Sequence, residues 1–447
     1  MQLSISTDSD LIKEEELGYS AILAEYGLEF RRKGSYLEVG EPCNPGWVLH
    51  ISVIKIQLLD LLQKLVPFLA SENVPFQVVA RPKNAISMLN SGGPFELLGK
   101  LVCIFPENDT RALYLSKRLI TLTGAFKGPA IPTDKYLGGC VYVGYSDKKQ
   151  SGDETDFKPR GITWPFTEIT SPSKTRQRKF LAGKYLPVLI LKTDSKGRVF
   201  KAIRFNKIFR PDWCLVKQGK HNMCTDESGR DMHDRLLWQQ KLHVQLSSII
   251  RVPRLIDMFT EQNDTYLVME FINGKSLNEL VEENMSVQRR ISILITICEC
   301  LSILHQQGYI HRDLSSVNFM VNNKNEVSFI DLELAYSIKT GEPNPPYTWG
   351  TEGFMSPEQI NNAKPTIEQD IYGLGSLLLY TLTGVTPLDC GHPDLTKVEK
   401  VLLSNISYKP LNRIILFCLD PLSEKRPCIY NIIQGLKNFA SYLIKTS

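Results

Sequence analysis

The sequence lacks several features that would assign it to a special class of protein. Its 447 residues include ten cysteines but no Cys-x-x-Cys pair, so the spacing offers no zinc site, and free thiols in a reducing compartment are the simple interpretation. No apolar run is long and uninterrupted enough to cross a bilayer, and the N-terminus has no basic segment followed by an apolar one. These absences predict a cytoplasmic protein without a membrane partner.

The sequence also has no large excess of positive or negative charge. The formal net charge is only +4, from 52 Lys and Arg against 48 Asp and Glu, which argues against a dedicated nucleic-acid partner. A hydrophobic fraction of 43% is that of an ordinary globular chain, and the length allows two or three domains with full cores. Composition does not identify the function, which must be inferred from sequence motifs.

Hydrophobic patterns divide the chain into an N-terminal part and a longer C-terminal part. Residues 1–150 mix helical and strand periods, and residues 151–180 are polar and rich in Lys, Ser, Thr and Pro, as in a linker. Residues 181–270 alternate strands with one amphipathic helix, whereas helical periods dominate residues 271–447. We expect an α+β chain in which an N-terminal α/β domain precedes a bilobal C-terminal fold.

The most informative stretch of the chain is His311-Arg312-Asp313-Leu314-Ser315-Ser316-Val317-Asn318. It fits the pattern H-R-D-x-x-x-x-N and so resembles the catalytic loop of protein kinases. The resemblance implies that Asp313 orients the attacking hydroxyl and accepts its proton. It also implies that Asn318 holds a metal ion on the nucleotide phosphates.

Further motifs of the kinase pattern lie where the resemblance predicts them. Asp331 follows a strand-like run and resembles the metal-binding Asp of D-F-G, while Lys217 resembles the nucleotide lysine of V-A-I-K. Gly197 is the single glycine of the expected phosphate loop. Glu270 and Phe271 open the expected hinge, whose backbone groups would bind adenine. The resemblance therefore implies ATP and Mg²⁺ as cofactors.

Four later residues resemble supporting residues of a kinase. Glu358 closes a segment similar to G-T-x-x-F/Y-x-A-P-E, and Arg426 would form its buried ion pair, because one half of such a pair left alone would be costly. Asp370 begins a run similar to D-x-W/Y-S-L-G, whose Asp would support the catalytic loop. Thr351 would line the peptide site, and this segment argues against a small-molecule kinase, which usually lacks it.

One expected group is missing. A kinase carries a Glu on the helix after the nucleotide lysine, and the best-aligned residue here is Gln239, which can hydrogen-bond an ammonium group but cannot form the ion pair. Together with the poor glycine loop, Gln239 leaves a pseudokinase scaffold open as an alternative. Retention of Lys217, Asp313, Asn318 and Asp331 favours an active enzyme.

The remaining motifs resemble a more specific family, the class III and class IV lanthionine synthetases. Asp331-Leu332-Glu333 is similar to their Asp-Phe-Glu or Asp-Leu-Glu, and Ser315 replaces the Lys of most Ser/Thr kinases. Three N-terminal runs resemble the phosphoserine/phosphothreonine lyase region of these synthetases. Residues 47–52 are similar to W-K-L-H-V-S, residues 99–106 to G-K-x-x-x-I/V-Y/F-P, and residues 128–134 to G-P-x-I/V-x-S/T-D.

This resemblance implies a lyase-like N-terminal domain, with His50 and Lys100 as its remaining site residues. Where the family has Phe-Lys and Arg-Tyr-Gly, however, this chain has Phe76-Gln77 and Gly144-Tyr145-Ser146. Elimination of phosphate needs a base for the α-proton, an acid for the leaving group and cations for the phosphate. Other cations that would substitute are Arg81, Lys83, Lys127 and Lys135. A folded remnant that binds peptide or a partner subunit is the alternative.

The family's C-terminal zinc cyclase is not found before the chain ends at Ser447. We therefore expect an ATP- and Mg²⁺-dependent Ser/Thr kinase that acts on a ribosomally made precursor peptide, in lanthipeptide-type maturation, with separate lyase or cyclase subunits. Two alternatives stay open. One is a bifunctional kinase and phospho-Ser/Thr lyase, and the other is a pseudokinase scaffold that recruits the peptide and its partner enzymes.

Overall fold

The computed structural model describes residues 18–42, 45–90, 93–146, 162–169, 179–205, 211–348 and 350–446. The chain divides into two compact units. The first comprises Met1–Phe205, Lys217–Asp234 and Phe259–Tyr266, and the second comprises Asn206–Val216, Arg235–Met258 and Leu267–Ser447. Of the expected linker, residues 151–161 and 170–178 lie outside the described residues.

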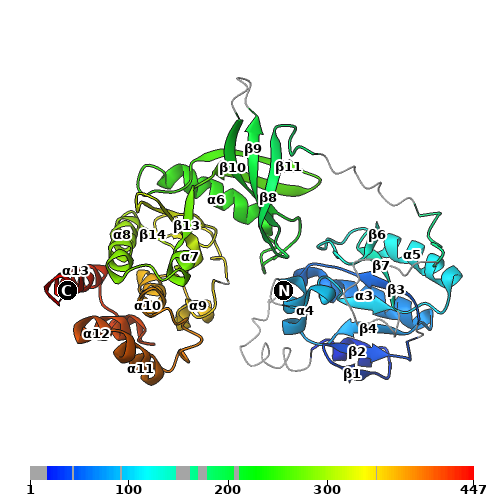
Figure 1. The fold of residues 1–447 in the computed structure, drawn as a ribbon. Coiled ribbons are helices and arrows are strands. Elements are labelled where there is room, and N and C mark those ends of the chain that lie inside the picture. The colour runs from blue at the N-terminus through cyan, green and yellow to red at the C-terminus, as the bar shows by residue number, and fades with distance from the viewer. Residues whose placement is uncertain are drawn as a thin grey trace. The chain divides into compact units, whose positions relative to one another are not determined.

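A seven-stranded sheet forms the N-terminal domain (Figure 1). The strand order is β1-β2-β4-β5-β3-β7-β6, and every neighbouring pair is antiparallel. The strands are β1 (Arg31–Lys33), β2 (Tyr36–Val39), β3 (Gly46–Ile51), β4 (Phe76–Val79), β5 (Val102–Ile104), β6 (Lys135–Gly138) and β7 (Val141–Ser146). The expected mixture of helices and strands is therefore built on an antiparallel sheet.

The two faces of this sheet differ in polarity because side chains alternate along each strand. Leu49 and Ile51 point to one face, where their partners in register, Ile104 and Val102, are also buried. Helices α3 (Lys55–Ser71) and α5 (Asp109–Thr123) bury leucines in the same core. The shorter helices are α2 (Ser20–Glu25), α4 (Pro82–Leu89) and the 3₁₀ turn η1 (Phe95–Leu97). The domain thus buries one apolar face, and its polar face remains for a site.

Part of the expected linker belongs to the core of this domain. Trp164 and Phe166 pack edge-on against Trp47, with ring centroids 5.5 and 5.3 Å apart, and Phe166 is almost fully buried. Aromatic pairs of this geometry add about 0.5–1.5 kcal/mol beyond the area they bury. Residues 162–169 are therefore held against β3 by aromatic packing.

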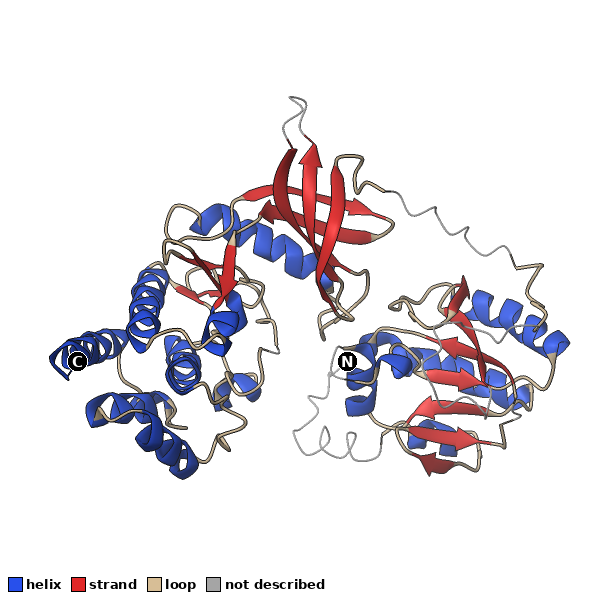
Figure 2. Cartoon of the chain, viewed as in Figure 1, coloured by secondary structure: helices blue, strands red, loops and turns tan. Residues whose placement is uncertain are grey.

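A smaller sheet of five strands begins the C-terminal part, with the order β11-β12-β10-β9-β8 (Figure 2). Its strands are β8 (Tyr185–Thr193), β9 (Arg198–Phe205), β10 (Pro211–Gly219), β11 (Leu255–Glu261) and β12 (Asp264–Glu270), and helix α6 (Met232–Leu246) lies between β10 and β11 in the chain. This order leaves β8 at one edge of the sheet.

Helices dominate the rest of the chain. The longest apolar stretch of the sequence forms α10 (Ile367–Thr383), and 14 of its 17 residues are buried in the core of this part. No helix among the described residues combines the length and the apolarity that a membrane span requires. The other elements are β13 (Gly274–Ser276), α7 (Leu277–Glu282), α8 (Val287–Gln306), β14 (Tyr309–Ile310), η2 (Ser316–Asn318), β15 (Phe319–Asn322), β16 (Val327–Phe329), β17 (Tyr336–Ser337), α9 (Pro357–Ile360), α11 (Leu395–Asn405), α12 (Lys409–Cys418), η3 (Ser423–Lys425) and α13 (Ile429–Thr446).

A sheet-rich small part followed by a helical large part agrees with the expected bilobal fold. The α+β class is confirmed.

Candidate active site

Asp313 and Asn318, the two ends of the predicted catalytic loop, contact each other between β14 and β15. Asn318 Nδ2 donates to the main-chain oxygen of Asp313 at 2.9 Å and to Asp313 Oδ2 at 2.8 Å. Because the amide nitrogen makes both bonds, the orientation of the side chain is set and its oxygen takes part in neither. A carbonyl oxygen of this kind is a ligand that Mg²⁺ accepts.

The second carboxylate oxygen of Asp313 binds the segment that was expected to line the peptide site. Asp313 Oδ1 accepts the backbone N–H of Thr351 at 3.0 Å. Burial raises the pKa of Asp313 above its usual value, and the hydrogen bonds from Thr351 act in the opposite direction. The carboxylate is therefore placed between the catalytic loop and the peptide segment, where a base for a substrate hydroxyl is needed.

Asp370, at the start of α10, holds the backbone of the catalytic loop. Its Oδ2 accepts the N–H of His311 at 2.7 Å and lies 2.8 Å from His305 Nε2, while its Oδ1 accepts the N–H of Arg312 at 2.7 Å. Burial alone would raise the pKa of Asp370, but these partners outweigh it and lower the pKa. Arg312 has a φ of +66°, in the left-handed region, so these bonds stabilise a strained backbone.

Arg312 joins the catalytic loop to the segment that follows Asp331. Its guanidinium is buried, and Nη1 donates to the main-chain oxygens of Tyr347 at 2.6 Å and of Leu334 at 3.3 Å. Burial lowers the pKa of Arg312 to about 10. The segment is thus tied to the loop through backbone carbonyls.

Helix α6 is joined to the same segment. Trp238 Nε1 donates to the main-chain oxygen of Ala335 at 2.8 Å, and Lys241 Nζ lies 2.6 Å from Glu342 Oε2. The first contact is buried and the second is half exposed. A buried bond to the backbone determines the position of a helix more strongly than an exposed ion pair, which contributes little.

Gln239, the residue in place of the expected Glu, faces the strand end that carries Asp331. Its side chain is fully buried, and Nε2 lies 3.5 Å from the main-chain oxygen of Ile330. Leu332 is buried in the core of the large lobe. Gln239 therefore lies next to the segment that carries Asp331, and as a neutral side chain it cannot form the ion pair that a Glu would make.

The remaining predicted nucleotide groups lie on other elements. Lys217 is on β10 and belongs to the first unit, whereas Glu270 and Phe271 end β12 and follow it in the second unit. The N–H of Glu270 donates to the main-chain oxygen of Arg254 at 2.8 Å. This N–H is therefore committed to the sheet, and adenine would have to use other backbone groups of the hinge.

Gly197 ends a tight turn between β8 and β9. The N–H of Asp194 donates to the main-chain oxygen of Gly197 at 3.0 Å, which closes the turn. Gly197 has a φ of +154°, and a Cβ there would lie 2.1 Å from the main-chain oxygen of Gln218. Glycine is required here by the close approach of this turn to Gln218 of β10, in addition to any role toward phosphate.

The two residues predicted to bind a metal ion are Asn318 and Asp331. Among the residues the structure describes, no group of three or more His, Cys, Asp or Glu side chains could hold a metal ion. Mg²⁺ in phosphate-transferring enzymes is commonly bound by one or two protein oxygens together with substrate phosphates and water. The residues present therefore fit a Mg²⁺ ion that is shared with the nucleotide.

Glu358 and Arg426 form an ion pair with two parallel N–H···O contacts. Arg426 Nη1 lies 2.5 Å from Glu358 Oε1, and Nη2 lies 3.0 Å from Oε2. The arginine side chain is fully buried. Parallel bonds of this kind add geometric specificity to the charge interaction.

A line of polar side chains crosses the other face of the N-terminal sheet. Successive strands place Glu38, Gln77, Cys103, His50 and Tyr142 opposite one another in register. All of them except Gln77 are almost fully buried. This line of polar side chains contains His50, one of the two predicted lyase-site residues.

His50 and Lys100, the predicted lyase-site pair, share one carboxylate. His50 Nδ1 lies 2.5 Å from Asp134 Oδ2, and Lys100 Nζ lies 3.1 Å from Asp134 Oδ1. Burial alone would lower the pKa of His50, but Cys103 and Asp134 raise it to about 9. Burial would raise the pKa of Asp134, but its cationic partners lower it to about 2. His50 is therefore protonated near neutral pH, as a proton donor must be.

Three positions at which the lyase pattern carries a cation are neutral in this chain: Val48, Gln77 and Gly144. All three lie on the polar face, because Val48 pairs with Gly144 and Gln77 belongs to the polar line. Gln77 Nε2 donates to Glu38, and a Cβ at Gly144 would lie 3.2 Å from Asp134 Oδ1. The site keeps His50 and Lys100 but has no cation at these three positions of the pattern.

The cations considered as substitutes lie on several elements. Arg81 and Lys83 are at the start of α4, and Lys127 precedes β6. Lys135 pairs with Val143, which places it on the apolar side of the sheet, where its ammonium lies 3.9 Å from the ring centroid of Trp164. Lys135 is therefore engaged in packing rather than in the polar line.

The His50–Asp134 pair predicts that the stability of the N-terminal domain depends on pH. The pKa of His50 rises from 6.5 to about 9 on folding, so the stabilisation is fully present below pH 6.5 and is lost as the pH passes through 9. At about 1.4 kcal/mol per unit, the loss is about 3 kcal/mol. We expect faster amide exchange in β3 and β7 at about pH 10 than at about pH 7, after correction for intrinsic exchange rates. The His50→Gln variant should show a smaller change, and equal changes in both proteins would contradict the assignment.

Comparison with protein families agrees with this geometry. Residues 216–446 match the protein kinase domain, and residues 34–161 match the family described as RamC, N-terminal domain. The first match contains the catalytic loop, Asp331 and Asp370. The second contains the polar line and Asp134.

Individual relatives are similar to the kinase part. A probable serine/threonine-protein kinase of Clostridium perfringens is 29% identical over 177 residues, which cover 39% of this chain and 26% of the relative. The probable serine/threonine-protein kinase PknB of Lactococcus lactis is 27% identical, over 42% of this chain and 34% of the relative. The serine/threonine-protein kinase PknB of Mycobacterium tuberculosis is 33% identical, over 29% and 21%. The chain thus spans about a third or less of the length of these relatives.

Proposed function

This chain belongs to the protein kinase family, a family of phosphotransferases, and we propose that it phosphorylates Ser and Thr side chains of a ribosomally made precursor peptide with ATP. The observation that carries the proposal is the position of Asp313, whose carboxylate contacts both Asn318 and the backbone of Thr351. The match of residues 34–161 to the RamC N-terminal domain supports peptide maturation of the lanthipeptide type.

In the proposed reaction, the substrate hydroxyl attacks the γ-phosphorus of ATP, an O–P bond forms, and the bond to the β-phosphate oxygen breaks. Asp313 would accept the hydroxyl proton. Asn318 and Asp331 would hold Mg²⁺, which supplies neutralisation of charge on the phosphate oxygens when it is bound. Lys217 would hold the α- and β-phosphates, with Gln239 as a neutral hydrogen-bonding partner.

The test is the mass of a Ser/Thr-rich peptide, taken from the gene neighbourhood or from a synthetic library, after incubation with the full chain, ATP and Mg²⁺. We expect a gain of phosphate. The Asp331→Asn variant should need about tenfold more Mg²⁺ for half-maximal activity, since one charged ligand is lost. The control is Asp389→Asn, which removes an exposed carboxylate of the large lobe. No phosphate gain by a folded enzyme would refute the proposal.

Phosphate elimination by the N-terminal domain is a second candidate, favoured by the protonated His50 beside Asp134. Its neutral Val48, Gln77 and Gly144 oppose it. We therefore propose that phosphopeptide accumulates and that separate lyase and cyclase subunits complete the maturation. Loss of phosphoric acid from the peptide without any added partner would assign elimination to this chain.

A non-catalytic scaffold is the other alternative, and Gln239 is the residue that favours it. In the system assembled with its partner subunits, the Asp331→Asn variant separates the two roles. Unchanged peptide modification would favour the scaffold, whereas a raised Mg²⁺ requirement supports catalysis by this chain.

A further inference from the structure

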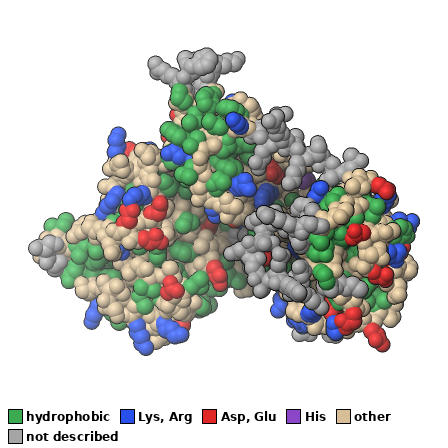
Figure 3. Space-filling view, turned by 45° about the vertical axis from the view of Figure 1, so that its right-hand side comes forward, with side chains coloured by type: hydrophobic (Ala, Val, Ile, Leu, Met, Phe, Trp, Pro, Cys, Tyr) green, Lys and Arg blue, Asp and Glu red, His purple; other side chains and the backbone are tan. Residues whose placement is uncertain are grey.

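The edge strand β8 exposes an uninterrupted apolar run. Val188, Leu189, Ile190 and Leu191 are each between 46 and 55% exposed. Hydrophobic side chains also gather over this small sheet in the space-filling view (Figure 3). Natural sheets usually protect their edges with charges or with very short strands, and β8 has nine residues. An exposed apolar edge of this length marks an interaction surface.

The outer backbone of β8 is available along this run. On its inner side β8 pairs with β9, from Tyr185 opposite Arg204 to Thr193 opposite Arg198. On its outer side, within the described part of the chain, Tyr185 exchanges two backbone bonds with Leu181, and no strand pairs beyond it. An extended peptide can therefore lie along β8, as in strand-addition complexes.

Irregularities in β8 make side-chain contact more important than a long hydrogen-bond ladder. The pairing with β9 shifts between Pro187 and Leu189 and again between Ile190 and Lys192. Bulges of this kind bend an edge and interrupt regular pairing. We therefore expect apolar burial, at about 25 cal/mol per Å², to supply most of the contact.

Basic residues outnumber acidic ones in the stretch of chain that contains the apolar run. Residues 179–205 contain one acidic residue, Asp194, which lies 3.2 Å from Lys192. The basic residues of this stretch are Lys179, Lys184, Lys192, Lys196, Arg198, Lys201 and Arg204. Two copies of β8 paired antiparallel would bring two segments with the same excess of basic residues together, which is unfavourable. The charge thus favours an acidic peptide over a second copy of this chain.

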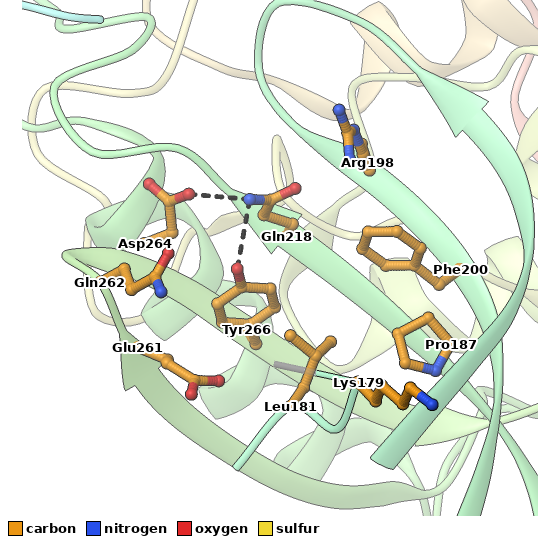
Figure 4. A pocket seen from close by; sticks show the side chains of 10 residues that line it. All are labelled: Lys179, Leu181, Pro187, Arg198, Phe200, Gln218, Glu261, Gln262, Asp264 and Tyr266. Atoms are coloured by element: carbon orange, nitrogen blue, oxygen red, sulfur yellow. Dashed lines mark hydrogen bonds between the residues drawn. The ribbon is translucent and has the colours of Figure 1, made fainter. Parts of the chain in front are cut away.

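A pocket of about 340 Å³ adjoins β8 (Figure 4). Phe200, which is opposite Ile190 in register, and Tyr266 supply its buried aromatic surfaces. Lys179 and Arg198 also line it. Among the described residues, neither of these two side chains has a hydrogen bond or an ion pair.

The two acidic side chains of the pocket already accept hydrogen bonds from other groups of the chain. Glu261 accepts the backbone N–H of Ala182 at 3.1 Å, and Asp264 accepts a hydrogen bond from Gln218 Nε2 at 2.7 Å (Figure 4). Within the described part of the chain, neither Lys179 nor Arg198 forms an ion pair with these carboxylates. An acidic side chain or a terminal carboxylate of a bound peptide can therefore pair with them.

We propose that the β8 surface, defined here as Val188–Leu191 with the adjoining pocket, docks an extended peptide segment that carries apolar and acidic side chains. This inference rests on the proposed function, because it assigns the surface to the peptide substrate, at a segment remote from the Ser or Thr that is phosphorylated. Docking there raises the effective concentration of the reacting residue at the catalytic loop.

Binding is tested with the full chain, without ATP, so that failure of phosphate transfer cannot affect the result. The probe is a fluorescent synthetic peptide of alternating Glu and Leu, and its control has Lys in place of each Glu. We expect the acidic peptide to bind about tenfold more tightly than the basic one. The Val188→Glu/Ile190→Glu double variant should lose about tenfold in affinity, and so should Lys179→Glu. Leu403→Glu, at a comparably exposed leucine of α11, should not.

Two results would overturn the inference. One is equal affinity of the acidic peptide for the wild type and the Val188→Glu/Ile190→Glu variant. The other is a wild-type dimer that this variant converts to a monomer in sedimentation, which would assign the surface to a second copy. With a phosphorylatable peptide, removal of the acidic-apolar segment should raise KM about tenfold and leave kcat unchanged.

Discussion

The Asp313→Asn variant is expected to transfer phosphate about 10²–10⁴-fold more slowly than the wild type, the range that a positioned general base contributes. The amide of Asn can still accept the N–H of Thr351, but it cannot take up the hydroxyl proton. Asn318 Nδ2, which donates to the Asp313 carboxylate at 2.8 Å, would also lose a charged partner. The measurement is the rate of transfer of labelled γ-phosphate to peptide at saturating ATP.

Two controls separate this effect from misfolding. The thermal shift produced by MgATP should stay that of the wild type, because Lys217, Asn318 and Asp331 are unchanged. Since burial raises the pKa of Asp313, activity of the wild type should fall on the acidic side at a higher pH than an ordinary carboxyl group would give. A variant that retains the wild-type rate would remove Asp313 from the mechanism.

The Arg426→Met variant is expected to lower the free energy of unfolding of the large lobe by about 3–5 kcal/mol, because it breaks a buried ion pair and leaves one charge without its partner. The guanidinium also donates to the main-chain oxygens of Glu368 at 2.8 Å and of Asp420 at 3.0 Å. Although burial raises the pKa of Glu358, Arg426 outweighs it and lowers that pKa. Urea unfolding, followed through amide exchange in α9 and α10, measures the loss.

A double variant and a matched pair provide the controls. Arg426→Met/Glu358→Gln should recover part of the stability, since no unpaired charge remains. Lys437→Met removes a partner of Glu299 at 2.8 Å in an exposed pair, and it should cost less than about 1 kcal/mol. Equal losses for Arg426 and Lys437 would show that the buried pair contributes no more than a surface contact.

The sequence determined the kinase class of the C-terminal part and the α+β class of the chain, and both are confirmed. Its signals are local: Asp313 and Asn318 are five residues apart in one loop, and the resemblance of that loop to H-R-D-x-x-x-x-N predicts their roles. Glu358 and Arg426 are far apart in the sequence, and the resemblance to kinases implied their pairing, with the cost of an unpaired buried charge as the physical reason.

The tertiary structure decided what depends on register and on long-range packing. Cys103 and Asp134 lie beside His50 only because β5 and the loop before β6 pack next to β3, and no periodicity within a strand carries that information. The one sequence feature that could have indicated Asp134 was its position as the Asp of the run 128–134, which is similar to G-P-x-I/V-x-S/T-D.

The same limit applies to the kinase part. The sequence identified Arg312 only as the arginine of the His-Arg-Asp motif. Its hydrogen bonds to the main chain of Leu334 and Tyr347 depend on how the segment after Asp331 folds back onto the loop. The sequence predicted strands somewhere in residues 181–270, and only the sheet order places the apolar run of β8 at an edge. Short spacings determine local chemistry, whereas partners distant in sequence are selected by the packing of the whole fold.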